Sequence, residues 1–168
     1  MGRAIALALA TVAAAVVASN ASAAALSPFE SHVVAQINHV REQHGLGPLR
    51  LSVKLNEAAH AHSLQMAHDG YFAHESADGS AFWKRIGTFY SSSPWSYWSV
   101  GENLLWEAPD VSPARAVQLW LASPEHRKNL LTSRWREIGI SAVHVGAAPG
   151  VYEGLPVTIV TTDFGVRR

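Results

Sequence analysis

The chain has 168 residues, of which 48% are apolar and 15% are charged; its formal net charge is zero, and it contains no cysteine. This composition is typical of one globular domain with a hydrophobic core, and it excludes a disordered or fibrous chain. A net charge of zero gives no electrostatic reason to expect a nucleic-acid partner or an anionic membrane surface, and the lack of cysteine excludes disulfides, thiolate metal sites and a cysteine nucleophile.

The first 23 residues have the layout of a secretory signal peptide. Arg3 gives a basic start, an alanine- and valine-rich run follows, and the tripeptide at positions 21–23 forms an A-x-A cleavage site. A transmembrane anchor is the alternative, but the apolar run is shorter than the ~20 residues that span a bilayer. We therefore predict that residues 1–23 are removed, and that residues 24–168 form a secreted domain without a transmembrane anchor.

Apolar periodicity, capping residues and glycines predict helices first and strands last along the mature chain. Helices are expected over residues 28–44, 52–70, 80–85, 112–123 and 123–131, with N-caps at Ser27, Ser52, Ser80, Ser112 and Ser123. Strands are expected over residues 136–146 and 157–166, joined by a long hairpin loop. Residues 45–52 are interpreted as a turn, and residues 88–100 as a loop rich in serine and aromatic residues. Helices early and strands late indicate an α+β domain or a three-layer α/β sandwich.

Nine histidines are many for this length. His62 lies on the apolar face of the second predicted helix and is predicted to be a hydrogen-bonded core residue. His74 precedes a turn, and His126 lies in the first turn of a capped helix, where the helix dipole favours the neutral, metal-binding form. With Glu102 these two match the ligand set of some catalytic zinc sites. Spacing alone does not bring the three together, because long stretches of chain separate them.

The sequence motifs of several enzyme classes are missing. There is no HExxH zinc motif, because Asp78 stands where the second histidine would follow His74 and Glu75. There is no G-x-S-x-G nucleophile elbow and no glycine-rich phosphate loop. These absences argue against a metalloprotease, a serine hydrolase and a nucleotide-binding enzyme of the usual kinds.

Six motifs follow one another along the mature chain. They are NHVR with HGLGPL (38–49), LNEAA with HSLQM (55–66), FAH with DG (72–79), GEN (101–103), WLASPEHRKNLL (120–131), and EIGI with TTDFG (137–140 and 161–165). In this order they resemble the bacterial branch of the CAP superfamily, which includes cysteine-rich secretory proteins, insect venom antigens and plant pathogenesis-related proteins. The resemblance covers nearly all of the mature chain and identifies it as a CAP, or SCP, domain.

The resemblance implies an α-β-α sandwich with a cleft lined by two histidines and two glutamates. His74, Glu102 and His126 match three of these positions, and Asn103 and Ser123 are expected to be cleft neighbours. In the family pattern a second glutamate follows the tryptophan of the late helix, whereas here Trp120 is followed three residues later by Ser123. A site with a single carboxylate would bind a divalent cation less strongly than the full set.

Two kinds of function follow from the resemblance. The favoured hypothesis is a secreted binding module for a lipid, another small apolar ligand or a cell-envelope component, with Trp95, Tyr97 and Trp98 as an apolar wall. These aromatic residues would equally suit packing within their own loop. The alternative is a metal-assisted hydrolase in which His74, Glu102 and His126 hold a divalent cation such as zinc. The sequence does not decide whether the protein is an enzyme, because fold does not fix function.

Overall fold

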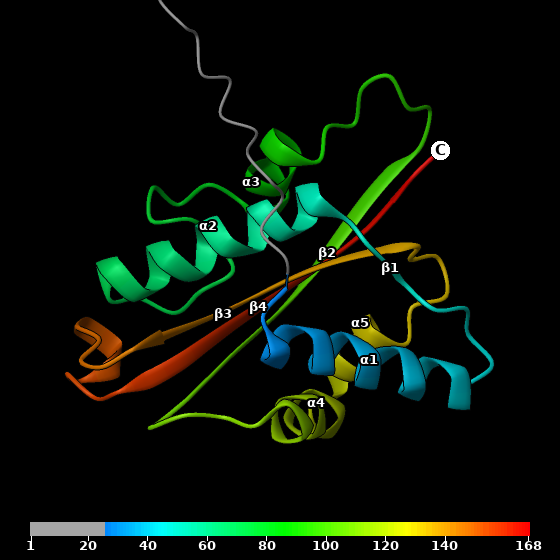
Figure 1. Ribbon diagram of the computed structural model, residues 1–168. Coiled ribbons are helices and arrows are strands. Elements are labelled where there is room, and N and C mark those ends of the chain that lie inside the picture. Colours follow the sequence, from blue (N-terminus) through cyan, green and yellow to red (C-terminus); the bar gives the residue numbers. More distant parts are fainter. Residues whose placement is uncertain (1–25) are drawn as a thin grey trace, which may run out of the picture.

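A four-stranded mixed sheet is the middle layer of the structure, a computed structural model that describes residues 26–168 (Figure 1). Helices α1 (Pro28–Gln43), α4 (Pro113–Ala122) and α5 (Pro124–Leu130) lie on one face, and α2 (Val53–Asp69) and α3 (Phe82–Phe89) lie on the other. The predicted three-layer α-β-α architecture is therefore confirmed. The predicted signal peptide, residues 1–23, lies outside the described residues, and its removal stays a prediction.

The sheet places the last strand of the chain in its interior. Its strands are β1 (Arg50–Leu51), β2 (Trp98–Glu107), β3 (Glu137–Val145) and β4 (Val157–Arg167), in the order β1-β3-β4-β2. Strand β1 runs parallel to β3, and the other two pairs are antiparallel. The predicted β3–β4 hairpin is present, and its long loop contains a short 3-10 helix, η1 (Gly150–Tyr152).

Three of the predicted serine caps start helices as expected. The Ser27 hydroxyl accepts a hydrogen bond from the Glu30 amide, while the Glu30 carboxylate accepts one from the Ser27 amide. Such a reciprocal pair satisfies two of the free amides at a helix start. Ser52 and Ser112 cap α2 and α4 with a single side-chain bond each, and Gly70 ends α2 in the left-handed conformation at a φ of 70°.

Other boundaries differ from the predictions. The helix expected over residues 80–85 spans Phe82–Phe89 instead, because the Ser80 amide donates to the Asp78 carboxylate and closes a turn before the helix begins. The helix then continues because Ile86 and Phe89 pack into an apolar cluster with Leu55. Residues 98–100, expected in a loop, already pair with β4, and residues 50–51, expected in a turn, form β1. Ser123 precedes α5 but makes no capping hydrogen bond from its side chain.

Both faces of the sheet carry apolar cores. Ile37, Trp120 and Phe164 belong to the cluster beneath α1 and α4, and Leu55 and Ile86 belong to the cluster beneath α2 and α3. Helix α2 approaches β3 so closely that a Cβ on Gly139 would lie 2.1 Å from the carbonyl carbon of Leu55. Helix α2 can therefore pack this closely on β3 only because residue 139 has no side chain.

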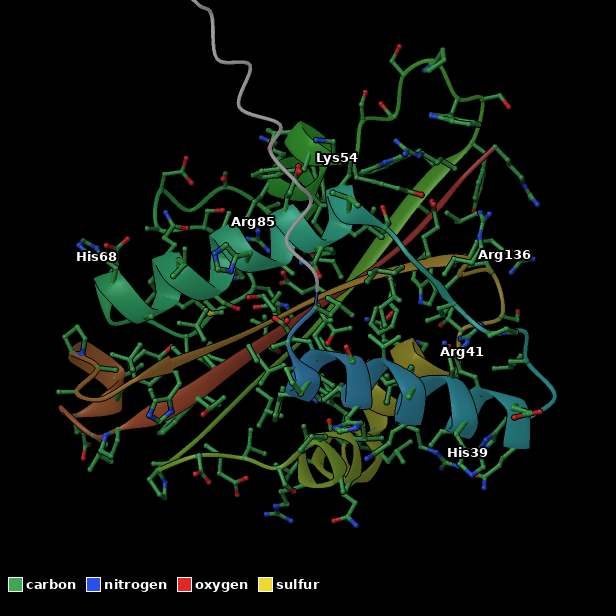
Figure 2. The ribbon with its side chains drawn as sticks, viewed as in Figure 1. His39, Arg41, Lys54, His68, Arg85 and Arg136 are labelled. Atoms are coloured by element: carbon green, nitrogen blue, oxygen red, sulfur yellow. The ribbon has the colours of Figure 1, made fainter. Side chains whose placement is uncertain are left out.

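A buried cation joins α1 to the segment that follows α5. Arg41 is 1% exposed, and its guanidinium donates to the carbonyls of Leu130 at 2.7 Å, Thr132 at 3.1 Å and Gly47 at 3.1 Å (Figure 2). Carbonyl oxygens thus replace the carboxylate that a buried arginine usually meets. The contacts fix the C-terminal end of α5, the helix that carries His126.

Candidate functional site

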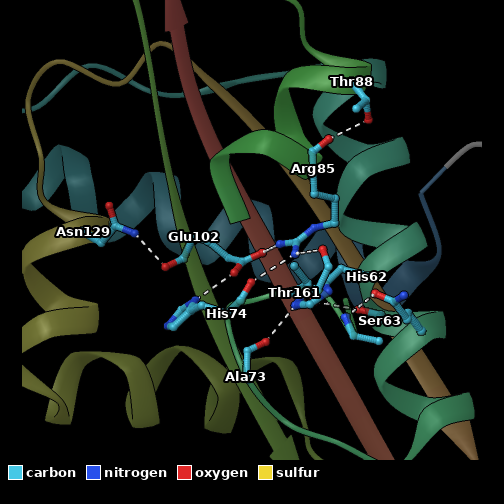
Figure 3. A network of polar contacts seen from close by, with 12 residues as sticks. His62, Ser63, Ala73, His74, Arg85, Thr88, Glu102, Asn129 and Thr161 are labelled. Carbon is cyan, nitrogen blue, oxygen red and sulfur yellow. Dashed lines mark hydrogen bonds and ion pairs between the residues drawn. The ribbon is translucent and has the colours of Figure 1, made fainter. Parts of the chain in front are cut away.

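Glu102 lies in the middle of β2, and its carboxylate is completely buried (Figure 3). One oxygen accepts a hydrogen bond from Nδ1 of His74 at 2.8 Å, and the other forms an ion pair with the guanidinium of Arg85. A buried carboxylate is stable only when charge and hydrogen bonds compensate it, and these two partners do so. The apolar neighbours Leu104 and Leu105 lie further along the same strand and anchor it in the core.

Arg85, from α3, also holds the segment that carries His74. Its guanidinium donates to the backbone carbonyl of His74 at 3.0 Å and to the Ser76 hydroxyl at 3.3 Å. One side chain thereby connects the histidine backbone, the following turn and the buried carboxylate. A loop histidine would otherwise be mobile, so Arg85 is a positioning residue for His74.

His74 presents one ring nitrogen to solvent. Its side chain is 45% exposed, although Nδ1 points inward to Glu102. A neutral ring that donates from Nδ1 carries its lone pair on Nε2, so the carboxylate selects the tautomer that offers a base or hydrogen-bond acceptor to the outside. The Phe82 ring packs at 6.1 Å from the His74 ring, centroid to centroid, and restricts its rotation.

His126 reaches the same cleft from α5. The Asn103 amide donates to the His126 carbonyl at 3.1 Å, and the Asn129 amide donates to the Glu102 carbonyl at 3.0 Å, so two hydrogen bonds join α5 to β2 beside the histidine. Burial lowers the pKa of His126, and a charged His74 would lower it further, whereas Glu125 opposes the shift. The direction agrees with the neutral form predicted from its place in α5.

The glycine of the GEN motif allows this close contact between α5 and β2. A Cβ on Gly101 would lie 2.7 Å from Oδ1 of Asn129 and 2.8 Å from the ring of Trp135. Those distances are below van der Waals contact, so a side chain here would displace the Asn129 amide or the Trp135 ring. The hydrogen bond that the Asn129 amide makes with β2 therefore depends on this glycine.

His74, Glu102 and His126 line one open pocket of ≈ 470 Å³. Apolar side chains form part of its wall, namely those of Phe82, Val100 and Trp135. Charged side chains also line it, namely those of Glu75, Glu125, Lys128 and Arg134. The pocket thus combines an apolar wall, two imidazoles and charges of both signs.

The sequence of the chain matches a known family over most of its length. The family model of the cysteine-rich secretory proteins, CAP, matches residues 34–161. The chain belongs to the CAP family. It is 33% identical over 123 residues to the uncharacterized protein YkwD of Bacillus subtilis strain 168, a match that covers 73% of this chain and 45% of that relative. The CAP domain described here thus spans less than half the length of that relative.

Solved structures share the CAP fold. An outer surface protein of Borrelia burgdorferi superposes with a TM-score of 0.64 at 20% identity, over 82% of this chain and 92% of the other. An extracellular protein of Bacillus anthracis that contains an SCP domain superposes with a TM-score of 0.62 at 24% identity, over 86% and 45%. At such identities the likeness establishes the fold alone. Within residues 26–168, no helix has the length and apolar character needed to cross a bilayer.

The donor atoms of this CAP domain do not fit a three-ligand metal site. Both oxygens of Glu102 are engaged, and the Arg85 guanidinium lies beside the carboxylate, so a cation there would face a positive charge. No group of three or more histidine, aspartate or glutamate side chains among residues 26–168 is arranged to hold a metal ion. Nε2 of His74 and the ring of His126 are the remaining donors, and metal binding by the predicted set stays a prediction.

The other predicted site residues of the CAP domain lie at different places. Asn103 lines the pocket, whereas Ser123 lies between α4 and α5 and is not among the lining residues. Trp95, Tyr97 and Trp98 do not line this pocket either. Trp98 packs into the cluster beneath α3, and its indole N–H donates to the Tyr90 carbonyl at 2.8 Å. A ligand wall built from these three aromatic residues would therefore belong to a different surface from the cleft.

Sequence reasoning missed three residues of the CAP site: Arg85, Asn129 and Asp163. Asp163 is the cross-strand partner of Glu102 and is fully buried, and a single carboxylate within a β-branched strand was a signal that something compensates it. Asn129 belongs to a motif already quoted, but its contact with β2 is visible only in three dimensions. Arg85 gave no signal, because a basic residue in a short helix is usually solvated.

Proposed function

We propose that this protein is an exported CAP-domain binding module whose cleft takes a small amphipathic ligand. A single observation carries the proposal: one pocket of ≈ 470 Å³ places an apolar wall of Phe82, Val100 and Trp135 beside the imidazoles of His74 and His126. Its volume falls within the range of about 300–1,000 Å³ that is usual for small-ligand sites. The ligand chain would lie against the apolar wall, and its polar head would meet the imidazoles.

Export is part of the proposal. It is supported by the signal-peptide layout of residues 1–23 and by relatives of the same fold that are described as an outer surface protein and as an extracellular protein. A protein outside the cytoplasm meets lipids and lipid-derived molecules of the cell envelope, and such molecules have the amphipathic character that the cleft suits.

The binding test compares two probes that share a twelve-carbon chain, dodecanol and dodecanoate. Tryptophan emission should change on addition of either probe, because Trp135 lines the cleft. Phe82→Ala should weaken the binding of both about tenfold, since it removes an apolar ring from the wall. Trp83→Ala is the matched control, because Trp83 is the next residue of α3, is 48% exposed and does not line the cleft.

The same titration tests the aromatic residues before β2 as an alternative wall. Trp95→Ala removes a ring that is 45% exposed and lies outside the cleft. Loss of binding in Trp95→Ala with no change in Phe82→Ala would overturn the assignment of the cleft. Unchanged emission in the wild type with both probes would overturn the amphipathic ligand itself.

A second function, hydrolysis, is favoured by the hydrogen bond between His74 and Glu102. A carboxylate that accepts from Nδ1 leaves Nε2 free to remove a proton from a water molecule, as a general base does. If the cleft works in this way, hydrolysis of a 4-nitrophenyl ester should fall at least tenfold in His74→Gln and be unchanged by a chelator. If the wild type hydrolyses the ester no faster than His74→Gln does, this function is excluded. If the chelator inhibits the wild type, the metal-assisted route is favoured instead.

A further inference from the structure

One end of the sheet carries a cluster of basic side chains. The strand register pairs Arg50 with Glu137, Glu137 with Gly165, and Trp98 with Arg167. The starts of β1, β2 and β3 and the end of β4 therefore lie at the same end of the sheet. The basic residues there are Arg50, Lys54, Arg136, Arg167 and Arg168, and we call them the basic edge. Figure 2 shows Lys54 and Arg136 toward this end, where the C-terminus also lies in Figure 1.

Few of these charges are compensated within the protein. Two acidic side chains, Glu137 and Glu57, stand against the five basic ones: Glu137 accepts the hydroxyl of Tyr90 and forms no ion pair within residues 26–168, and Glu57 pairs with Lys54 at 2.8 Å. The four arginines of the basic edge form no ion pair with any described residue. The edge therefore keeps a positive excess that the zero net charge of the whole chain conceals.

Aromatic rings hold two of the arginines in place. The guanidinium carbon of Arg167 lies 4.1 Å from the ring centre of Tyr90 and 5.4 Å from that of Trp95. That of Arg168 lies 4.9 Å from the ring centre of Tyr97. A guanidinium stacked on a ring keeps its N–H groups free at the edge, ready for a phosphate or carboxylate oxygen. The stacking thus orders the charges for binding an anion.

Apolar side chains are exposed among these charges. Leu51 is 47% exposed, Val53 44%, Trp95 45% and Tyr97 39%. Leu51 and Val53 stand next in sequence to Arg50 and Lys54, and Trp95 touches Arg167. Mixtures of arginine, tryptophan, tyrosine and aliphatic residues are typical of surfaces that lie in the headgroup layer of a membrane. A soluble polyanion would use the charges and leave the aliphatic residues in water.

The opposite end of the sheet carries acidic residues. Glu107 ends β2 and pairs with Arg115 at 3.4 Å, while Asp110 follows it and Glu153 lies in the β3–β4 hairpin loop, neither of them in an ion pair with any described residue. Positive and negative charges are therefore separated along the strands. Near an anionic surface the basic edge is attracted and the far end is repelled, which gives one preferred orientation.

We propose that the basic edge docks this protein on an anionic phospholipid membrane, with the arginines on lipid phosphates and the exposed aromatic and aliphatic side chains in the headgroup layer. The docking surface does not include the cleft residues His74, Glu102 and His126, so it is independent of what the cleft binds. Either proposal can fail while the other holds.

Vesicle co-sedimentation tests the docking. The wild type should bind vesicles of equal parts phosphatidylglycerol and phosphatidylcholine, but not vesicles of phosphatidylcholine alone, and binding should fall between about 50 mM and about 500 mM NaCl because salt screens exposed charges. The double variant Arg167→Gln with Arg168→Gln should bind the anionic vesicles about tenfold more weakly or worse. Equal binding of the wild type to both kinds of vesicle, or binding that does not change with salt, would overturn the proposal. Neither measurement depends on a variant that could fail to fold.

Two further variants separate membrane docking from general charge effects. The control removes two arginines elsewhere, Arg115→Gln with Arg127→Gln on α4 and α5, and should bind anionic vesicles as the wild type does. Val53→Ser removes an aliphatic side chain that is 44% exposed and stacks on no arginine, so it should weaken binding to the vesicles severalfold but leave binding to soluble inorganic polyphosphate unchanged. Equal losses in the two arginine variants, or binding to polyphosphate without binding to vesicles, would overturn membrane docking. Every variant keeps the same N-terminus, so differences in vesicle binding between the variants come from the substituted residues alone.

Discussion

Asp163 is a buried carboxyl group that lies behind Glu102 in the neighbouring strand. Its oxygens have no hydrogen-bond partner among the described residues unless the carboxyl group itself carries a proton. Burial, and then the charge of Glu102, raises the pKa of Asp163 well above its ordinary value, and the two carboxyl groups are close enough to share a hydrogen bond. A protonated Asp163 that donates to Glu102 leaves Glu102 as the single charge opposite Arg85 and His74.

Replacing Asp163 tests this state through the pH dependence of stability. Because its folded pKa lies above its unfolded value of about 3.9, the contribution of Asp163 to stability is lost as the pH rises from about 4 toward neutrality. Asp163→Asn keeps a donor toward Glu102 and does not titrate. The free energy of unfolding of this variant, measured in urea, should therefore rise relative to that of the wild type between about pH 4 and pH 7. Below about pH 4 the difference between the two proteins should not change with pH.

A control with the opposite sign is available in Asp78. Hydrogen bonds from Ser80 lower the pKa of this fully exposed carboxylate, so Asp78 stabilises the fold above its unfolded pKa and the stabilisation is lost in acid. Asp78→Asn should thus fall slightly below the wild type at pH 7 and match it at low pH. Parallel stability curves for wild type and Asp163→Asn would show that Asp163 is charged in the folded protein.

Single residues differ in how well the sequence predicted them. His62 was expected to be a hydrogen-bonded core histidine, and it is fully buried with Nε2 bonded to the Ala73 carbonyl at 2.9 Å. Burial lowers its pKa to about 4. Helical periodicity was enough to predict this, because the burial of a helix face is a local property. Arg85, the second partner of Glu102, could not be predicted in this way, because it reaches the carboxylate from a different element and no local pattern relates the two residues.

At the level of the elements, the contact between α2 and β3 rests on one glycine. A Cβ on Gly139 would lie 2.1 Å from the carbonyl carbon of Leu55 and 2.2 Å from the amide nitrogen of Asn56. Backbone atoms cannot move aside as the end of a side chain can, so α2 would have to lift from the sheet. Gly139→Ala should lower the free energy of unfolding by about 2–4 kcal/mol.

The matched control for this prediction is Gly146→Ala, at the residue that directly follows the other end of β3. A Cβ there would have no heavy atom within 4 Å. Its effect on stability should stay within about 0.5 kcal/mol. Both variants are compared by urea denaturation, and similar free energies of unfolding for the two would contradict the close packing of α2 on β3.

Element boundaries were predictable where a local signal sets them. The starts of α1, α2 and α4 follow serine caps, and α2 ends at a glycine. Strand β1 was missed because two residues show no periodicity, and their partner is the start of β3, far along the chain. The first residues of β2 have the sequence pattern of a loop, because serines and aromatic residues surround them, but their pairing with β4 makes them a strand.

At the scale of the whole molecule, composition predicted one globular domain and concealed how its charge is arranged. A formal net charge of zero argued against any anionic partner, but the strands place basic residues at one end of the sheet and acidic residues at the other. A sum over the sequence cannot contain this separation, because it depends on strand direction and register. The family resemblance supplied the three layers and the neighbours of Glu102 in the cleft, and it contained nothing about the two ends.

The position of β4 in the sheet also sets the order in which the chain can fold. In the order β1-β3-β4-β2, the interior strand β4 (Val157–Arg167) is the one described strand that pairs with both β3 and β2. A chain that emerges N-terminus first, from a ribosome or through a membrane pore, would present α1, α2 and β2 long before the strand that joins them. Until β4 appears, β3 and β2 have no common partner, and their apolar faces stay without cover. The sheet is thus unable to form as a whole while β4 is held back, so β2 must remain unpaired until late in synthesis.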